Sequence, residues 1–281
     1  MILNNGKLVI EISEQGAELK SAKKNGFEYM WCGDPEYWGR TSPVLFPFVG
    51  GLKDKKYKVQ GVEYSMSQHG FARDCKFELL KKTSDSVSYI LKSNEETLAK
   101  YPFEFSLIIK YTLTGSTVKV GWIVKNEGDE MMSFSIGAHP AFNLKEGVNY
   151  FGFDNKGDIT YNLIDGSGLY EEENRHILKN DGFVMIENSM FDHDALIIEN
   201  NQAKEVSLCD SKKNPYVKVK FDAPLFGLWS PIKKNAPFVC IEPWYGRCDR
   251  NDFCGELADK DYIINLGVGE EFETEYEIEF I

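Results

Sequence analysis

The sequence has little positive charge and few histidines. Its 281 residues include 32 Lys and Arg against 44 Asp and Glu, which gives a formal net charge of −12, and only four residues are His. Proteins that bind nucleic acid or an anionic membrane surface need clustered Lys and Arg to meet the phosphate charge. The acidic balance therefore argues against both partners. A neutral ligand remains compatible with this composition, as does an anionic ligand that is bound by a local group of Arg.

Long hydrophobic runs are also missing. The first residues, MILNNGK, lack the charged and then apolar order of a secretory signal, and no run approaches the roughly 18–20 apolar residues of a membrane-spanning helix. We therefore expect a cytoplasmic protein whose six Cys are free thiols. None of them forms a CxxC pair, and we expect neither a metal site nor an organic cofactor.

Alternation of apolar and polar residues is the dominant pattern that is present. Leu8, Ile10 and Ile12 share one face of a candidate strand, and the alternating stretches 103–113 and 118–124 form a predicted hairpin across a Gly-Ser turn at 115–116. Residues 271–280 alternate apolar residues with Glu, as expected of a strand with one face in water. The clearest helical signal covers residues 94–100 and is stopped by Pro102.

This pattern predicts an all-β protein. A composition of 42% hydrophobic and 27% charged residues is typical of a globular protein, and the chain is long enough for a large core without disulfides or metal. There is no repeat, low-complexity tract or long linker. We therefore expect one domain over residues 1–281, built as a large antiparallel sandwich or barrel.

Four segments break the alternation and concentrate polar, aromatic, Gly and Pro residues. Such segments are typical of loops at strand ends, where binding sites usually lie, and here they cover residues 37–54, 68–74, 137–143 and 240–247. His139 lies between a small residue and Pro. Glu242 follows an apolar strand that we expect Pro243 to end, because Pro cannot donate to the ladder. The residue types alone also fit structural roles, since a loop His and a strand-end carboxylate need not be catalytic.

In sequence order, these segments resemble the motifs of the aldose 1-epimerase (galactose mutarotase) family, and most closely its LacX-like branch. The matching motifs are EQGAEL (14–19), YWGR (37–40), LFP (45–47), QHGFAR (68–73), GAHPAF (137–142), FDH (191–193) and IEPWYG (241–246). The resemblance covers essentially the whole chain. It implies a β-supersandwich of two large twisted antiparallel sheets, with a sugar bound in a cleft on one of them.

The resemblance also implies roles for individual residues. His139 matches the general acid of the family and Glu242 its general base, while His69 and Asp192 match residues that contact the sugar. Further candidate sugar contacts, taken from the site-like loops, are Arg40, Arg73 and Trp244. One departure concerns Gly51, because many relatives carry a sugar-binding Arg there; Arg40, Lys53 and Arg73 are the candidates to replace it.

The activity implied is exchange of the α and β anomers of a hexose by acid–base ring opening, which requires no cofactor. Three alternatives remain. The substrate is a hexose 6-phosphate if Arg40 and Arg73 form a cationic subsite, or the protein binds a sugar in the same cleft without catalysis. A glycoside hydrolase fits less well because it needs two carboxylates, and only Glu242 is a motif-borne carboxylate. The sequence leaves the oligomeric state open.

Overall fold

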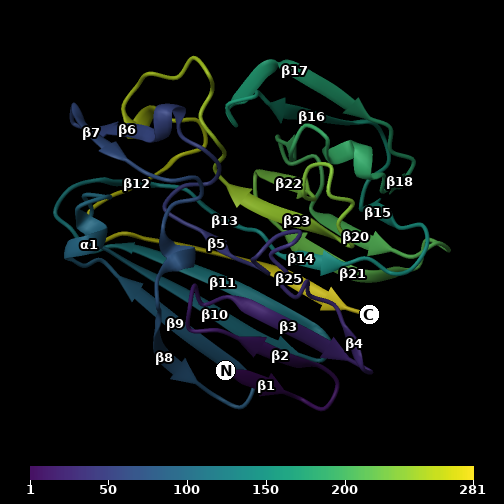
Figure 1. Ribbon diagram of the computed structural model, residues 1–281. Helices are drawn as coiled ribbons and strands as arrows, with labels where there is room; N and C mark the ends of the chain where they lie inside the picture. Colours follow the sequence, from purple (N-terminus) through teal and green to yellow (C-terminus); the bar gives the residue numbers. More distant parts are fainter.

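The computed structural model describes residues 1–281, of which 48% are in strands and 6% in helices. Two large antiparallel sheets dominate the fold, and β23 and β25, one from each sheet, lie near the centre of the molecule (Figure 1). The all-β prediction is therefore confirmed. None of the helical elements has the length and hydropathy of a membrane-spanning helix.

The first large sheet has nine strands. In spatial order they are β18 (Phe183–Met185), β15 (Tyr150–Phe153), β20 (Glu205–Cys209), β21 (Pro215–Phe221), β25 (Glu271–Phe280), β11 (Thr117–Asn126), β10 (Phe105–Thr114), β9 (Ser86–Lys92) and β8 (Glu78–Lys82). The second sheet has eight strands. They are β17 (Tyr170–Leu178), β16 (Ile159–Ile164), β19 (Leu196–Ile198), β22 (Leu225–Trp229), β23 (Phe238–Tyr245), β13 (Ile136–Ala138) and β5 (Val44–Leu45), with β14 (Ala141–Asn143) also paired to β23.

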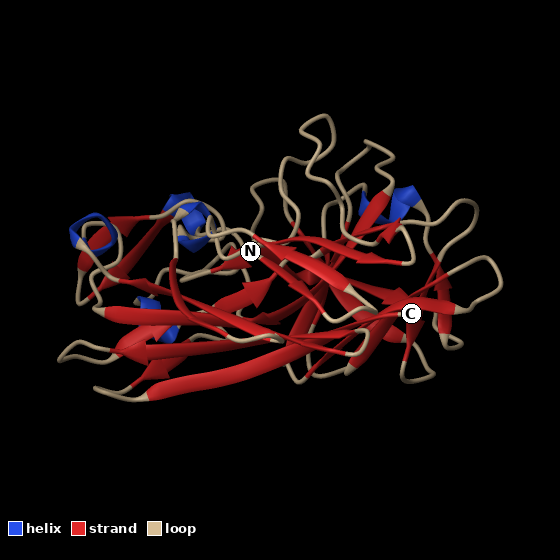
Figure 2. Cartoon of the chain, turned by 90° about the horizontal axis from the view of Figure 1, so that it is seen from below, coloured by secondary structure: helices blue, strands red, loops and turns tan.

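Smaller elements surround the two sheets. A four-stranded sheet contains β1 (Ile2–Asn4), β2 (Val9–Ile12), β3 (Leu19–Lys24) and β4 (Phe27–Glu28); two further pairs join β6 (Lys56–Val59) to β7 (Val62–Ser65) and β12 (Met132–Phe134) to β24 (Ile264–Leu266). The helical elements are α1 (Glu95–Leu98) and the 3₁₀ turns η1 (Lys53–Lys55), η2 (Ala72–Asp74), η3 (Asn188–Phe191) and η4 (Leu257–Asp259). Figure 2 shows that loops project mainly from one side of a body made of strands.

The predicted hairpin is confirmed by the pairing of β10 with β11. Thr114 faces Thr117 across Gly115, whose φ of 60° suits a tight turn. The acidic stretch 271–280 forms β25, and on its exposed face Lys119 of β11 lies 2.7 Å from Glu275. The short helix is also confirmed, since the Asn94 side chain accepts a hydrogen bond from the backbone N–H of Thr97 and so caps α1.

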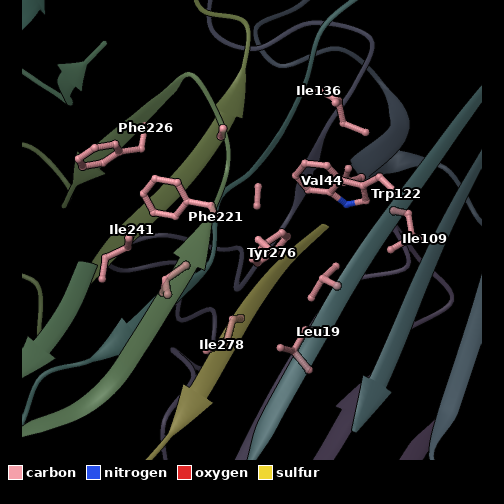
Figure 3. Packing of buried hydrophobic residues seen from close by; sticks show 14 of the residues in the cluster. Leu19, Val44, Ile109, Trp122, Ile136, Phe221, Phe226, Ile241, Tyr276 and Ile278 are labelled. Carbon is pink, nitrogen blue, oxygen red and sulfur yellow. The ribbon is translucent and has the colours of Figure 1, made fainter. Parts of the chain in front are cut away.

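A cluster of 61 buried residues fills the space between the sheets. Figure 3 shows Phe226 of the eight-stranded sheet next to Phe221 of the nine-stranded sheet, with 5.2 Å between the ring centroids, and Val44 of the eight-stranded sheet next to Trp122 of the nine-stranded sheet. Removal of this much apolar surface from water is the main force that holds the two sheets together. The core therefore leaves the outer face of the eight-stranded sheet free to carry polar groups.

The prediction that Pro243 ends its strand is wrong, because β23 continues through Pro243 to Tyr245. The reason lies in the neighbouring strand. Gly137 of β13 faces Trp244 and Ala141 of β14 faces Cys240, so residues 241–243 of β23 have no ladder partners on that side. A residue without an N–H is tolerated where the ladder is interrupted.

Candidate active site

The interruption between β13 and β14 brings His139 and Glu242 together. His139 follows β13 directly, and its Nδ1 lies 3.4 Å from Oε1 of Glu242 on β23. Strand alternation places Ile241 in the core between the sheets and turns its neighbours Cys240 and Glu242 to the opposite face. Two residues 103 positions apart in sequence thus meet because of one break in one strand.

Glu242 and His139 border a cavity of about 210 Å³ on this outer face. Of the residues predicted from sequence, the cavity brings together His69, Arg73, His139, Glu242 and Trp244, but neither Arg40 nor Asp192. The other lining residues are Trp38, Val49, Gly50, Gly51, Gln68, Ile164, Gly168, Asp194, Ala195, Ile197, Trp229 and Cys248. The wall is therefore partly aromatic and partly polar, which is typical of small-molecule sites.

Aromatic rings hold the imidazole of His139 on three sides. Trp38 stacks on it at 4.7 Å between ring centroids, while Trp229 and His69 approach edge-on at 5.1 Å and 5.7 Å. Sequence reasoning missed Trp229. The available signal was its position at the end of the apolar stretch 225–229, immediately before Ser-Pro. Packing of this kind fixes the orientation of the His139 ring and so the directions of its two nitrogens.

The indole ring of Trp244 packs against a glycine on each of two neighbouring strands. A Cβ added to Gly227 of β22 would lie 2.5 Å from the indole ring, and one added to Gly137 of β13 would lie 2.7 Å from it. Both distances are well inside van der Waals contact, so only glycine leaves room for the ring. The two glycines therefore position the indole beside Glu242 as part of the cavity wall.

The polar atoms of the His–Glu pair are buried and unpartnered. Glu242 is 1% exposed and neither of its carboxylate oxygens has a hydrogen-bond partner; His139 is 6% exposed and its Nδ1 has none. Burial raises the pKa of Glu242 well above its usual value, and the carboxylate of Asp194 adds to the shift. Burial lowers the pKa of His139 to about 3, and Arg73 adds to that shift. Buried polar groups are normally paired, so this site favours a ligand that supplies donors and acceptors.

His69 is held as a fixed hydrogen-bond donor. The backbone N–H of Gly50 donates to its Nδ1 at 3.0 Å, so the proton of the neutral ring lies on Nε2. Burial lowers the pKa of His69 well below its usual value. The backbone here is left-handed, with φ of 67° at His69, and a Cβ on Gly70 would lie 2.2 Å from the carbonyl oxygen of Phe46. The turn therefore requires glycine at position 70, and it holds His69 in a strained backbone conformation.

The two predicted arginines have different positions. Arg73, on η2, lines the cavity; its NH2 donates to the Gln68 carbonyl at 2.7 Å, but its Nε is buried without a hydrogen-bond partner. Burial lowers the pKa of Arg73 to about 10, with Arg40 contributing. Arg40 instead donates to Asp74 at 2.9 Å outside the cavity. Arg73 is thus the cation that faces the site, while Arg40 braces the adjacent loop.

The carboxylate opposite the pair comes from Asp194 and not from Asp192. Asp192 follows η3 and does not line the cavity, whereas Asp194, with φ of 74°, does. The backbone N–H of Ala195 donates to Asp194 Oδ1 at 2.8 Å, and burial raises the pKa of Asp194. Sequence reasoning missed Asp194, although it lies two positions beyond Asp192 in the same Asp-His-Asp run.

Gly51 lies on the cavity wall, next to the turn that follows β16. A Cβ at Gly51 would lie 3.3 Å from the carbonyl oxygen of Gly168, so this turn occupies the neighbouring space. Among Arg40, Lys53 and Arg73, only Arg73 lines the cavity. Arg73 is therefore the candidate that can supply, in this cavity, the positive charge of the Arg that many relatives carry at the position of Gly51.

A second cavity, of about 460 Å³, lies nearby on the same sheet and contains Arg247 and Arg250. The arginines at its centre already have carboxylate partners. Arg247 donates to Glu199 and to Asp261, both at 2.7 Å, and its guanidinium lies 3.7 Å from the centre of the Tyr170 ring. Because these groups already have partners, the smaller cavity with unpartnered atoms is the better candidate site.

The twisted two-sheet β-sandwich places the chain in the galactose mutarotase-like class of proteins, since solved structures of that class share its fold. The chain belongs to the aldose 1-epimerase family: the sequence profile of that family, described as aldose 1-epimerase, matches residues 1–265. Protein LacX of Lactococcus lactis subsp. lactis, in its plasmid form, is 32% identical over 94% of this chain and 93% of its own length.

Solved structures agree with this assignment. A galactose mutarotase related enzyme from Lactobacillus acidophilus is 36% identical, with a TM-score of 0.95 over 100% of this chain and 97% of its own. A galactose mutarotase-like protein from Lactobacillus casei is 28% identical, with a TM-score of 0.92 over 100% of this chain and 99% of its own. Family membership supports a sugar-binding enzyme of the isomerase class.

Proposed function

We propose that the protein is an aldose 1-epimerase that interconverts the α and β anomers of a hexose. The observation that carries the proposal is the buried pair of His139 and Glu242, which have unpartnered polar atoms and line one cavity of about 210 Å³. Two groups able to exchange protons at hydrogen-bonding range of one small ligand are what anomer exchange requires. Membership of the aldose 1-epimerase family supports the same reaction class.

In the proposed mechanism Glu242 takes the proton from the C1 hydroxyl. The C1–O5 bond breaks, its electron pair moves to O5, and His139 gives its proton to that oxygen. The open-chain aldehyde then rotates about C1–C2. In the closing step His139 takes the proton back from the C5 hydroxyl and Glu242 returns its proton to the carbonyl oxygen, which yields the other anomer. Atoms and charge balance over the cycle, and each side chain acts once as acid and once as base.

The pair must hold one proton in total for this cycle. Burial lowers the pKa of His139 to about 3 and raises the pKa of Glu242, so it favours the state with a neutral imidazole and the shared proton on the carboxyl. That is the state the pair reaches after ring opening, when the aldehyde is bound. Because the two groups are coupled, activity falls when the pair gains a second proton or loses its only one, which gives a bell-shaped pH profile.

Other cavity residues fit roles in holding the sugar. His69 offers Nε2–H, Asp194 offers a carboxylate, and the rings of Trp38 and Trp244 offer apolar faces. Hydrogen bonds to hydroxyl groups and contact with an aromatic face together fix a sugar ring in orientation. We assign these residues to substrate positioning and not to proton transfer.

The test replaces each member of the pair. H139N and E242Q keep the side-chain shape but remove proton transfer, so we expect kcat to fall at least about 100-fold in each. Anomer exchange of glucose and galactose is followed by polarimetry, with H193N as the control because His193 is exposed and does not line the cavity. Near-normal turnover in either variant removes the assignment. If the wild-type protein binds sugar but exchanges no anomers, it is a non-catalytic sugar-binding protein.

The unpartnered Nε of Arg73 favours a second candidate, a hexose-6-phosphate 1-epimerase. Asp74 lies 3.8 Å from this atom, which is too far for a hydrogen bond. The guanidinium can therefore still donate hydrogen bonds to a phosphate group. The measurement compares kcat/KM for glucose and glucose 6-phosphate in wild type, R73Q and R40Q. A phosphate preference of tenfold or more that R73Q removes and that salt weakens supports this candidate. Equal use of both sugars leaves the neutral hexose.

A further inference from the structure

We infer that His139, Cys240 and Glu242 form a binding site for a thiophilic divalent cation such as Zn²⁺, and that the bound cation inhibits anomer exchange. The inhibition rests on the function proposed above. The binding does not, because it follows from the donor atoms alone. This site departs from the expectation of no metal site, because only the fold brings these three residues together. The cation is not required for the reaction, since in this site it opposes it.

Two of the donor atoms have the spacing of zinc ligands, and the third lies close to them. One ligand atom from each of the three residues lies within 4.8 Å of the other two, and His139 Nδ1 and Glu242 Oε1 are 3.4 Å apart. Zinc binds N and O at about 2.0–2.1 Å in a tetrahedron, which puts two such ligands roughly 3.3–3.4 Å from each other. The same gap is long for a hydrogen bond, whose usual N···O distance is about 2.9–3.0 Å.

The donor atoms are also free. Cys240 is 0% exposed, and His139 and Glu242 are 6% and 1% exposed. Nδ1 of His139 and both carboxylate oxygens of Glu242 have no hydrogen-bond partner, although buried polar atoms are normally paired. A cation would satisfy all three residues at once. The adjoining cavity supplies space for water as a fourth ligand, as in zinc sites with three protein ligands.

The fold explains why these residues converge. Cys240 and Glu242 are two positions apart on β23, so strand alternation turns both to the cavity side, and His139 enters from the break opposite them. A thiolate, an imidazole and a carboxylate together favour Zn²⁺ or Co²⁺ over Mg²⁺ and Ca²⁺, which prefer oxygen ligands.

Occupation of this site stops the proposed chemistry. Metal binding displaces the protons of the thiol and the carboxyl group, because ligands coordinate in their deprotonated form. The lone pairs of Nδ1 and of the Glu242 carboxylate then belong to the metal, and Glu242 no longer takes the proton of a C1 hydroxyl. Removal of the cation by EDTA restores the pair.

The experiment uses Co²⁺ and Zn²⁺ on a C32S/C254S protein, which lacks the two exposed thiols. Co²⁺ bound to a thiolate gives a sulfur-to-metal charge-transfer absorption band, which reports Cys240 ligation without reference to activity. We expect one Co²⁺ per chain, displaced by Zn²⁺, and a loss of glucose anomer exchange of at least tenfold that EDTA reverses. The Co²⁺ band also appears if the protein has no epimerase activity, so the two proposals fail separately.

The decisive variant is C240A. It is expected to keep basal anomer exchange, to lose the Co²⁺ band and to need at least ten times more Zn²⁺ for half inhibition. C209A is the matched control, because Cys209 is equally buried but lies on β20 of the other large sheet. If C240A does not fold, weaker Co²⁺ binding by tenfold or more in H139Q and E242Q takes its place. The inference is wrong if C240A keeps both the Co²⁺ band and the Zn²⁺ inhibition. It is also wrong if C209A removes them.

Discussion

Glu242 shows how much a single side chain depends on its surroundings. A carboxyl group that is 1% exposed and has no hydrogen bond is costly to keep as an anion, and burial accordingly raises its pKa. His139 meets the same burial with the opposite charge, and its pKa falls. Each buried, unpartnered group alone would destabilise the fold. Together, at 3.4 Å, they form a pair that can exchange protons with one ligand.

This burial predicts a pH effect on stability. The pKa of His139 is about 3 in the folded chain against 6.5 in an unfolded one, so its stabilising contribution is present above pH 6.5 and is lost as pH falls toward 3. Between pH 7 and 4.5 we expect the free energy of unfolding to fall by about 2–3 kcal/mol from this group. Glu242 acts with the opposite sign, because a raised pKa favours folding at low pH.

The comparison is urea unfolding of wild type and H139Q at pH 7 and pH 4.5. H139Q should lack the His139 contribution and lose correspondingly less stability on acidification. H193Q, which alters an exposed His, should behave as wild type. An identical acid loss in H139Q and wild type would contradict the assignment of this effect to His139.

At the scale of elements, the break between β13 and β14 decides the site. Strand pairing runs to Gly137 and resumes at Ala141, and the three residues between carry His139 to the face where β23 presents Glu242. Continuous pairing would leave no gap at this point. The interruption also permits Pro243 within β23. The same irregularity thus accommodates Pro243 in the backbone and places His139 beside Glu242. Strand irregularities next to active sites are common.

The packing of β22 against Trp244 gives a second prediction. G227A puts a methyl group 2.5 Å from the indole ring, so the ring or the strand must shift. We expect a loss of about 1–3 kcal/mol in the free energy of unfolding, together with a raised KM for the sugar, because Trp244 lines the cavity.

The matched control for G227A is G121A on β11. A Cβ there has Lys110 Cβ, at 4.0 Å, as its nearest neighbour, so it meets no crowding. Stability and KM of G121A should remain close to wild type. Equal losses in the two variants would show that strand glycines in general, and not contact with Trp244, cause the effect.

At the scale of the whole molecule, the core joins the sheets into one body of packed side chains. The 61 buried residues of the main cluster come from both large sheets and from the four-stranded sheet at the N-terminal end. We propose that residues 1–281 unfold as one domain. Circular dichroism of the strands and fluorescence of the Trp residues should then report the same midpoint in urea. Separated transitions would indicate two cooperative units instead.

Much of the architecture follows from the sequence alone. Alternation in β10 and β11, the turn at Gly115 and the cap at Asn94 depend on residues within a few positions of each other. Periodicity and turn chemistry are local properties, and they therefore predict local structure well. The motifs around His139 and Glu242 could also be found, because each breaks the alternation within a short segment.

The tertiary structure decided which side chains meet. Asp194, whose backbone has a left-handed φ of 74°, lines the cavity, and Asp192 does not. Arg73 lines the cavity while Arg40 pairs with Asp74 outside it. Such choices depend on strand register, on breaks in the ladder and on the direction of single turns. These combine contacts over a hundred or more residues, so no pattern within one segment contains them.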